Sequence, residues 1–226
     1  MCWSKEISMV SFIIAIFGCI YLYIRNSPND RWVALFAATV AMIQLAEFFM
    51  WSDPTCSNFN KYASMFALLI LALEPLMGML GGIYLSNSPN KNILKYMLLA
   101  YLIFIAFVYF TSFYNKNVIW CGTSSCSPTA ATLELIRKTN NNILPNGKSC
   151  NLSWFFVNTI NHKLVIIWIL FLLIPFLTMT PMYQGILILI FGIVTYGVSY
   201  VSQSNIGGSM WCWFAIGLIF LKLAIG

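Results

Sequence analysis

Two carboxylic acids, Glu47 and Glu74, stand inside long apolar stretches of this 226-residue sequence. A charged carboxylate at the centre of a membrane helix costs roughly 2.5–3.5 kcal/mol on insertion scales. No Lys or Arg lies at a similar depth in any apolar stretch, so each acid is expected to be a neutral member of a hydrogen-bonded network or to line a wet cavity. Such acids serve proton, cation or substrate relays. The alternative is a pair of protonated acids that only hold helices together.

The residues after Glu74 favour a polar site in the middle of the membrane. Pro75 follows directly, and because proline has no backbone N–H, the carbonyl of Leu71 loses its helical partner. Broken backbone at membrane depth is tolerated where protein or water satisfies it. Small residues that permit close helix contact follow at Gly78, Gly81 and Gly82.

Other polar residues could complete this site. Gln44 lies one turn from Glu47, and adjacent antiparallel helices could place the two acids one above the other. Thr195 and Ser199 lie on one stripe of a later apolar stretch. They could join the polar interior, although such stripes more often serve interhelical packing and hydrogen bonding.

We expect no catalytic residue, no metal site and no cofactor. A retinal photoreceptor needs a Schiff-base lysine in the middle of the last span, and Lys222 lies a turn from its end. His162 is the single histidine, and no Gly-rich phosphate loop or His-Glu-x-x-His appears. A zinc site formed by Cys121, Cys126, Cys150 and His162 is an alternative that lacks the usual Cys-x-x-Cys spacing. The net charge of +6 is spread along the chain, so nucleic-acid binding has no support.

The composition of the chain predicts that most of its surface faces lipid. The chain is 60% hydrophobic and 8% charged, whereas soluble domains carry roughly 25% charged residues. Continuous apolar runs of about 17–25 residues predict helices that cross a bilayer, and barrel strands would alternate instead. The fold class is therefore an all-α polytopic transmembrane bundle in a single domain. Its seven predicted spans are residues 7–24, 32–51, 62–85, 93–113, 163–180, 182–201 and 208–224.

The charges favour an N-terminus outside and a C-terminus inside. Short connections near span ends carry more Lys and Arg on the cytoplasmic side. One side, opposed by Asp30 alone, holds five such residues: Arg25, Arg31, Lys91, Lys95 and Lys222. The opposite side carries the long segment 114–162 between spans four and five, which we expect to form an outer subdomain. Two turns on the basic side, 23–29 and 84–90, share an Asn-Ser-Pro-Asn sequence; this indicates either an internal duplication or the same turn chemistry used twice.

The cysteines support the same orientation. One of the seven, Cys19, lies within the first span, and the other six fall on or beside the proposed outer face: Cys2, Cys56, Cys121, Cys126, Cys150 and Cys212. An even number of thiols on one side is typical of disulfides in an oxidising compartment, although the pairing is open and free thiols are the alternative. Asn151, in an Asn-Leu-Ser triplet, is a formal glycosylation acceptor on that face.

The opening Met1-Cys2-Trp3-Ser4 resembles the start of a family of bacterial and large DNA virus seven-helix membrane proteins. The similarity extends to the Glu47 region, to Glu74-Pro75-Leu76, to the Cys121 and Cys126 pair, and to Trp211-Cys212. The family often shows Gln-Pro where this chain has Glu-Pro. The resemblance implies no established activity; it implies that Cys2 and Cys212 both lie at the outer face, where they could bond, and that a viral host or virion membrane is a possible location.

Three functions are compatible with these residues. The first is a small transporter or channel for an ion or small molecule, with Glu47 and Glu74 on its path. The second is a receptor-like or structural membrane protein whose outer loop binds a partner. The third is a membrane enzyme acting on lipid or quinone, for which no nucleophile or cofactor signature is present.

Overall fold

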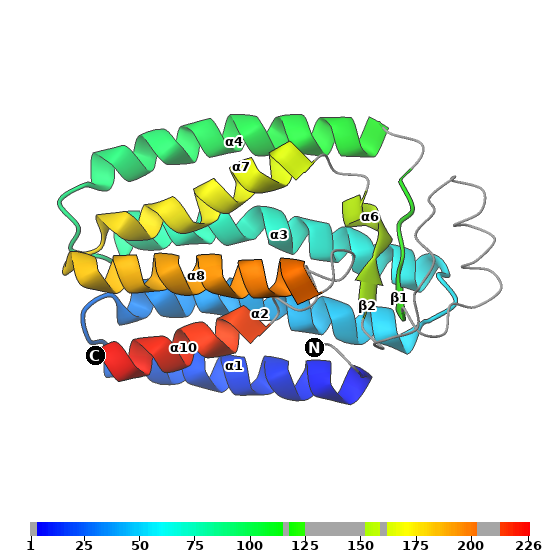
Figure 1. The fold of residues 1–226 in the computed structure, drawn as a ribbon, viewed down its shortest axis with the longest axis horizontal. Helices are drawn as coiled ribbons and strands as arrows, with labels where there is room; N and C mark the ends of the chain where they lie inside the picture. The colour runs from blue at the N-terminus through cyan, green and yellow to red at the C-terminus, as the bar shows by residue number, and fades with distance from the viewer. Residues whose placement is uncertain (1–3, 115–117, 125–151, 159–161, 203–212) are drawn as a thin grey trace.

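The computed structural model describes residues 4–114, 118–124, 152–158, 162–202 and 213–226, and it is mainly helical, as predicted. Figure 1 shows the long helices lying roughly along one axis. The helical elements are α1 (Lys5–Arg25), α2 (Asp30–Ser52), α3 (Asn58–Tyr84), α4 (Lys91–Tyr114), α6 (Phe155–Asn158), α7 (His162–Leu173), the 3-10 turn η1 (Ile174–Thr178), α8 (Met182–Ser202) and α10 (Phe214–Ile225). The two strands are β1 (Gly122–Ser124) and β2 (Leu152–Trp154).

Four of these helices are long and apolar enough to cross a membrane. They are Lys5–Arg25, Asp30–Ser52, Asn58–Tyr84 and the Lys91–Thr111 part of α4. The described parts of the other three predicted spans are shorter apolar helices, Lys163–Thr178, Met182–Val198 and Phe214–Ile225. Four spans therefore rest on helix length and composition, and the full set of seven stays a prediction.

The outward faces of the peripheral helices are apolar, which fits lipid as their solvent. Phe17 on α1 is 69% exposed and Tyr96 on α4 is 76% exposed. Large exposed apolar side chains also follow one another along α8, from Ile186 to Val198. Soluble proteins rarely expose apolar surface this continuous, whereas a bilayer favours it. The chain has the features of an integral membrane protein.

The helix ends follow the local sequence. Ser4 caps α1, because its hydroxyl accepts a hydrogen bond from the Ile7 amide at 3.3 Å. The helix ends at Asn26, whose left-handed backbone (φ 53°) lets its N–H bond to the Leu22 carbonyl at 3.0 Å. The fifth predicted span is not one α-helix: α7 ends at Leu173, and the chain continues as η1 because Pro175 lacks the N–H that an α-helix needs.

An aromatic layer packs the interior of the bundle at the level of the first turns of α2. Trp32 stacks on Phe176 with ring centroids 5.5 Å apart, and Phe36 meets Phe176 edge-on at 4.8 Å. Trp32 also lies directly against Gly81 of α3, where an added Cβ would come within 2.5 Å of the indole. The small residue is required at this position because α2 and α3 approach so closely.

The two ends of the bundle differ. The cap end carries the start of α1 and a two-stranded antiparallel sheet in which Gly122 pairs with Trp154 and Ser124 with Leu152. The turn end carries the α1–α2 and α3–α4 connections, residues 179–181 and the C-terminus (Figure 1). Both strands belong to the predicted outer subdomain 114–162, most of which lies outside the described residues.

Candidate intramembrane polar site

Glu74 lies buried at a break in the α3 hydrogen-bond ladder. Glu74 is 2% exposed, and Pro75 is the next residue in the helix. Pro75 leaves the Leu71 carbonyl without a helical donor. The indole Nε1 of Trp168, from α7, donates to this carbonyl at 2.8 Å. The unsatisfied group inferred from the sequence is therefore satisfied by a side chain of another helix.

Two further aromatic side chains donate to backbone carbonyls near the break. The Tyr101 hydroxyl, from α4, bonds to the Ala72 carbonyl at 2.7 Å. The Trp32 indole, from α2, bonds to the Gly78 carbonyl at 2.6 Å. The middle of α3 is thus held from three sides by donors on α2, α4 and α7. These contacts fix the orientation of the segment that carries Glu74.

Removing the Trp168 donor should expose the cost of the break. We expect Trp168→Phe to lower the free energy of unfolding by about 1–3 kcal/mol, because a buried carbonyl is left unsatisfied. In a Pro75→Ala background the restored N–H can bond to Leu71, so the same substitution should cost much less. Thermal unfolding of the four proteins in one detergent measures this coupling. Equal losses in both backgrounds would show that the indole does not serve the break.

The Tyr101 hydroxyl of α4 bonds to the backbone of α3 at Ala72, two residues before Glu74. Within the described part of the chain, the Arg25–Asp30 and Lys222–Asp30 ion pairs lie at Asp30 and not at Glu74. The acid is buried three residues after the Leu71 carbonyl that Pro75 deprives of its helical donor. A group in these surroundings can exchange a proton or a small cation when the packing around it changes.

Glu47 and Gln44 are also buried, at 0% and 2% exposure, but at another depth. Trp32 bonds to Gly78 at one end of the α2–α3 pair, and Met50 accepts from Asn60 near the other. This register places Glu47 about eleven residues, or about 16 Å, from the depth of Glu74. The structure therefore offers two acid positions in separate layers and not one carboxylate pair.

The two strands β1 and β2 together with α6 form a small cap on the bundle. This cap lies over the layer that holds Glu47. Leu152, Trp154 and Phe156 pack with α2 and α3 side chains, including Ala46 and Met50 on either side of this acid. The disulfide between Cys56 and Cys121, with Cα atoms 5.4 Å apart, joins the α2–α3 connection to the residue before β1. The cap is thereby fixed covalently to the helix ends.

Asn60 is the main polar contact between the cap and the bundle. Its residue is 0% exposed, and its amide donates to the carbonyls of Met50, Asp53 and Gly122 at 3.2, 2.7 and 2.7 Å. Its Oδ1 accepts from the Gly122 N–H at 2.9 Å and from the Ser64 hydroxyl at 3.3 Å. One side chain therefore joins α2, α3 and β1.

Asp53 orders the connection between α2 and α3. Burial raises the pKa of its carboxyl, but hydrogen bonds from the Ser57 and Thr55 hydroxyls and from the amides of Asn60 and Thr55 outweigh burial, so the pKa lies below the ordinary Asp value. These bonds form to the charged carboxylate.

The lowered pKa of Asp53 predicts acid sensitivity at the cap end. An unfolded Asp has a pKa of roughly 3.9, so these bonds stabilise the connection above that pH and are lost as the pH falls through the lower folded value. We expect hydrogen exchange of residues 53–60, corrected for the intrinsic rate, to accelerate below about pH 4. Asp53→Asn should remove this acid response; a variant that keeps it would assign the response to another group.

Of the other predicted residues, some lie on helices of the bundle and others lie outside the described residues. The Thr195 hydroxyl bonds to carbonyls of its own helix, Phe191 at 2.8 Å and Gly192 at 3.0 Å, and Ser199 follows on the same helix. α8 packs on η1, α7 and α10. Cys19 is buried as a free thiol. Five predicted residues, with the pairing inferred for two of them, lie outside the described residues: Cys2, Cys126, Cys150, Asn151 and Cys212.

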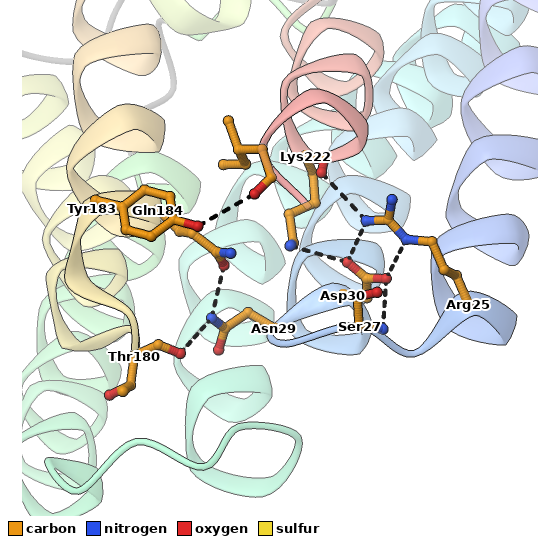
Figure 2. Close-up of polar contacts among 9 residues, drawn as sticks. Arg25, Ser27, Asn29, Asp30, Thr180, Tyr183, Gln184 and Lys222 are labelled. Atoms are coloured by element: carbon orange, nitrogen blue, oxygen red, sulfur yellow. Dashed lines mark hydrogen bonds and ion pairs between the residues drawn. The ribbon is translucent and has the colours of Figure 1, made fainter.

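The turn end holds a charged cluster that sequence analysis did not recognise. Arg25 donates from Nε and Nη2 to the two oxygens of Asp30 at 2.7 and 2.9 Å, and Lys222 Nζ lies 3.2 Å from Asp30 Oδ1 (Figure 2). The Asp30 and Lys222 side chains are 0% exposed. In the sequence these charges indicated only which side of the membrane each turn faces. The signal in the sequence was the position of Arg25, Asp30 and Lys222 at span ends on one predicted side of the membrane.

The two turns with shared sequence bind the same segment beside this cluster. Asn29 donates to the Thr180 carbonyl and to Gln184 Oε1, both at 3.0 Å. Ser88, in the other turn, donates to the Thr178 carbonyl. Figure 2 shows Asn29 reaching from the α1–α2 connection to the start of α8. The two turns use different positions of the shared sequence for these contacts, the last residue in one turn and the second in the other.

Comparison with known proteins identifies no relative: no family model matches the chain, and neither does any curated protein or solved structure.

Proposed function

We propose that the protein is a small membrane transporter in which Glu74 takes up and releases a proton or another small cation. The observation that carries this proposal is the acid's place at the α3 break, where backbone carbonyls are held by side chains of α2, α4 and α7. Pro75 removes one backbone hydrogen bond from an otherwise continuous α3, and ionisable residues within membrane helices commonly mark ion pathways.

The break supplies a means of coupling ion uptake to movement. Each side-chain bond to a carbonyl contributes about 0.5–1.5 kcal/mol, so a shift of α4 or α7 against α3 can exchange such bonds at modest cost. The same shift changes the surroundings of the Glu74 carboxyl. The Tyr101 hydroxyl of α4, which bonds to the Ala72 carbonyl two residues before Glu74, would move with α4.

Glu47 is a second position on the same path. It lies toward the cap, about 16 Å from the depth of Glu74, and it is fully buried with Gln44 as its polar neighbour along α2. An ion entering from the cap end would meet Glu47 first, so opening of the cap would be the first step of entry.

Vesicles reconstituted with the purified protein test this function. An imposed pH gradient across the vesicle membrane should dissipate faster than in protein-free vesicles, as followed with an enclosed pH-sensitive dye. Sodium and potassium gradients test the other small cations. Vesicles that stay as tight as protein-free ones to all three ions would rule out the transporter.

The second candidate function is partner binding through the cap. The observation in its favour is that the cap is fixed by a disulfide and by Asn60, which suits a rigid recognition surface. A protein without flux whose cap binds a partner would favour this reading.

A further inference from the structure

The charged cluster at the turn end joins two consecutive helices, α1 and α2, to α10, where Lys222 lies 197 positions after Arg25. Arg25 ends α1, Asp30 begins α2, and Lys222 lies in the last turn of α10. Besides the Asp30 contacts, Arg25 Nη2 donates to the Lys222 carbonyl at 3.3 Å, and the Ser27 amide donates to Asp30 Oδ2 at 2.9 Å (Figure 2). The Asp30 carboxylate therefore accepts hydrogen bonds from Arg25 and the Ser27 amide on one side and pairs with Lys222 of α10 on the other.

Stability alone does not account for a cluster of this kind. Removing two charges from water costs several kcal/mol per ion, and well-packed apolar residues often replace a buried ion pair without loss. At the end of a bundle, however, charged groups can separate into water and recover their hydration. Contacts of this type are suited to being made and broken during a conformational change.

Polar contacts hold α8 at the same end. Asn29 bonds to Thr180 and Gln184, as described above. α8 and α10 in turn pack on each other through the stacked rings of Phe191 and Phe214, 5.5 Å apart. α8 and α10 therefore form a pair that is fastened to the α1–α2 connection by charged and amide groups.

The cluster lies on the turn-end side of the layer that holds Glu74. By the α2–α3 register, Asp30 is about six residues, or about 9 Å, beyond the depth of Glu74. The layer between them is the aromatic packing of Trp32 and Phe36. Separation of α10 from α1 and α2 here would open a route toward that layer.

We propose that Arg25, Asp30 and Lys222 form a gate that closes the turn end, opposite the cap. The inference rests on the proposed transport function, because a gate requires a path behind it. Breaking the cluster moves the α8–α10 pair away from α1 and α2 and admits water to their interface.

Cys19 is a native reporter of this opening. It is a free thiol, 5% exposed, on α1 about 9 Å along the helix from Arg25. A Cβ added to the neighbouring Gly18 would come within 2.8 Å of Ile219 of α10, so Cys19 lies close to the interface that the gate would open. Its reaction with a water-soluble maleimide can be located by mass spectrometry of the labelled peptide.

The test compares variants of the full chain in lipid nanodiscs, where both membrane faces are accessible. Asp30→Asn and Lys222→Met should each accelerate labelling of Cys19 at least about tenfold, which corresponds to a shift of about 1.4 kcal/mol in the open–closed equilibrium. Lys222→Met is the decisive variant if Asp30→Asn misfolds, because Asp30 keeps its bonds to Arg25 and Ser27. Lys95→Gln, which removes an exposed cation at the same end, should label like wild type.

The result separates the gate from the transport proposal. A folded Lys222→Met protein whose Cys19 labels at the wild-type rate would overturn the gate, whatever the flux measurements show. If both variants label faster but no protein shows flux, the turn end opens as proposed but the transport function is wrong. The cluster would then have no path to gate.

Discussion

Glu74→Gln is expected to abolish the flux across reconstituted vesicles while leaving the protein folded. Glutamine keeps the size and hydrogen-bonding capacity of a neutral glutamic acid but cannot bind or release a proton. Glu74 is 2% exposed and lies beside the Pro75 break. Because Glu47 and Asp30 lie about 16 Å and about 9 Å from its depth, neither of these carboxylates can take its place. We expect the rate to fall to that of protein-free vesicles, with little change in the midpoint of thermal unfolding.

Two matched variants decide what a loss of flux means. Glu6→Gln makes the same chemical change at an exposed position at the start of α1, and it should transport like wild type. Glu47→Gln tests the second acid, and a partial loss is expected if Glu47 is a station on the path. Full flux in Glu74→Gln would contradict the role of this carboxyl, and Glu74 would then be structural.

Asn60→Ala should destabilise the cap by about 2–4 kcal/mol. The substitution removes bonds to three carbonyls and leaves the buried Gly122 N–H without its acceptor, and an unsatisfied buried donor costs about 1–3 kcal/mol on its own. Hydrogen exchange should accelerate in residues 118–124 and 152–156, while the centre of α3 stays protected. The cap would thereby become the least stable part of the bundle.

Asn58→Ala provides the control, since it makes the same change on the exposed first residue of α3. It should alter the unfolding midpoint very little. Uniform acceleration throughout the bundle in Asn60→Ala would contradict a local role in holding the cap. If the cap controls entry to the path, Asn60→Ala vesicles should also show faster flux than wild type.

Much of the architecture follows from the sequence by itself. A chain with 60% hydrophobic and 8% charged residues has too few charges for a water-facing surface, so helices in lipid were the outcome to expect. The freed carbonyl of Leu71 was also predictable, because it follows from the covalent structure of Pro75. Local rules of this kind need no knowledge of neighbouring helices.

What satisfies Leu71 was decided by the tertiary structure. Trp168 lies 97 positions away, and no spacing rule connects an indole to a particular distant carbonyl. The same holds for Lys222 and Asp30, which appeared in the sequence as separate surface charges and are a buried ion pair in the fold. The depth difference between Glu47 and Glu74 depends on the register of α2 against α3, which Trp32 and Asn60 set by packing and hydrogen bonding. Composition and backbone chemistry act through neighbours in the chain, whereas partners and register arise only when the helices pack.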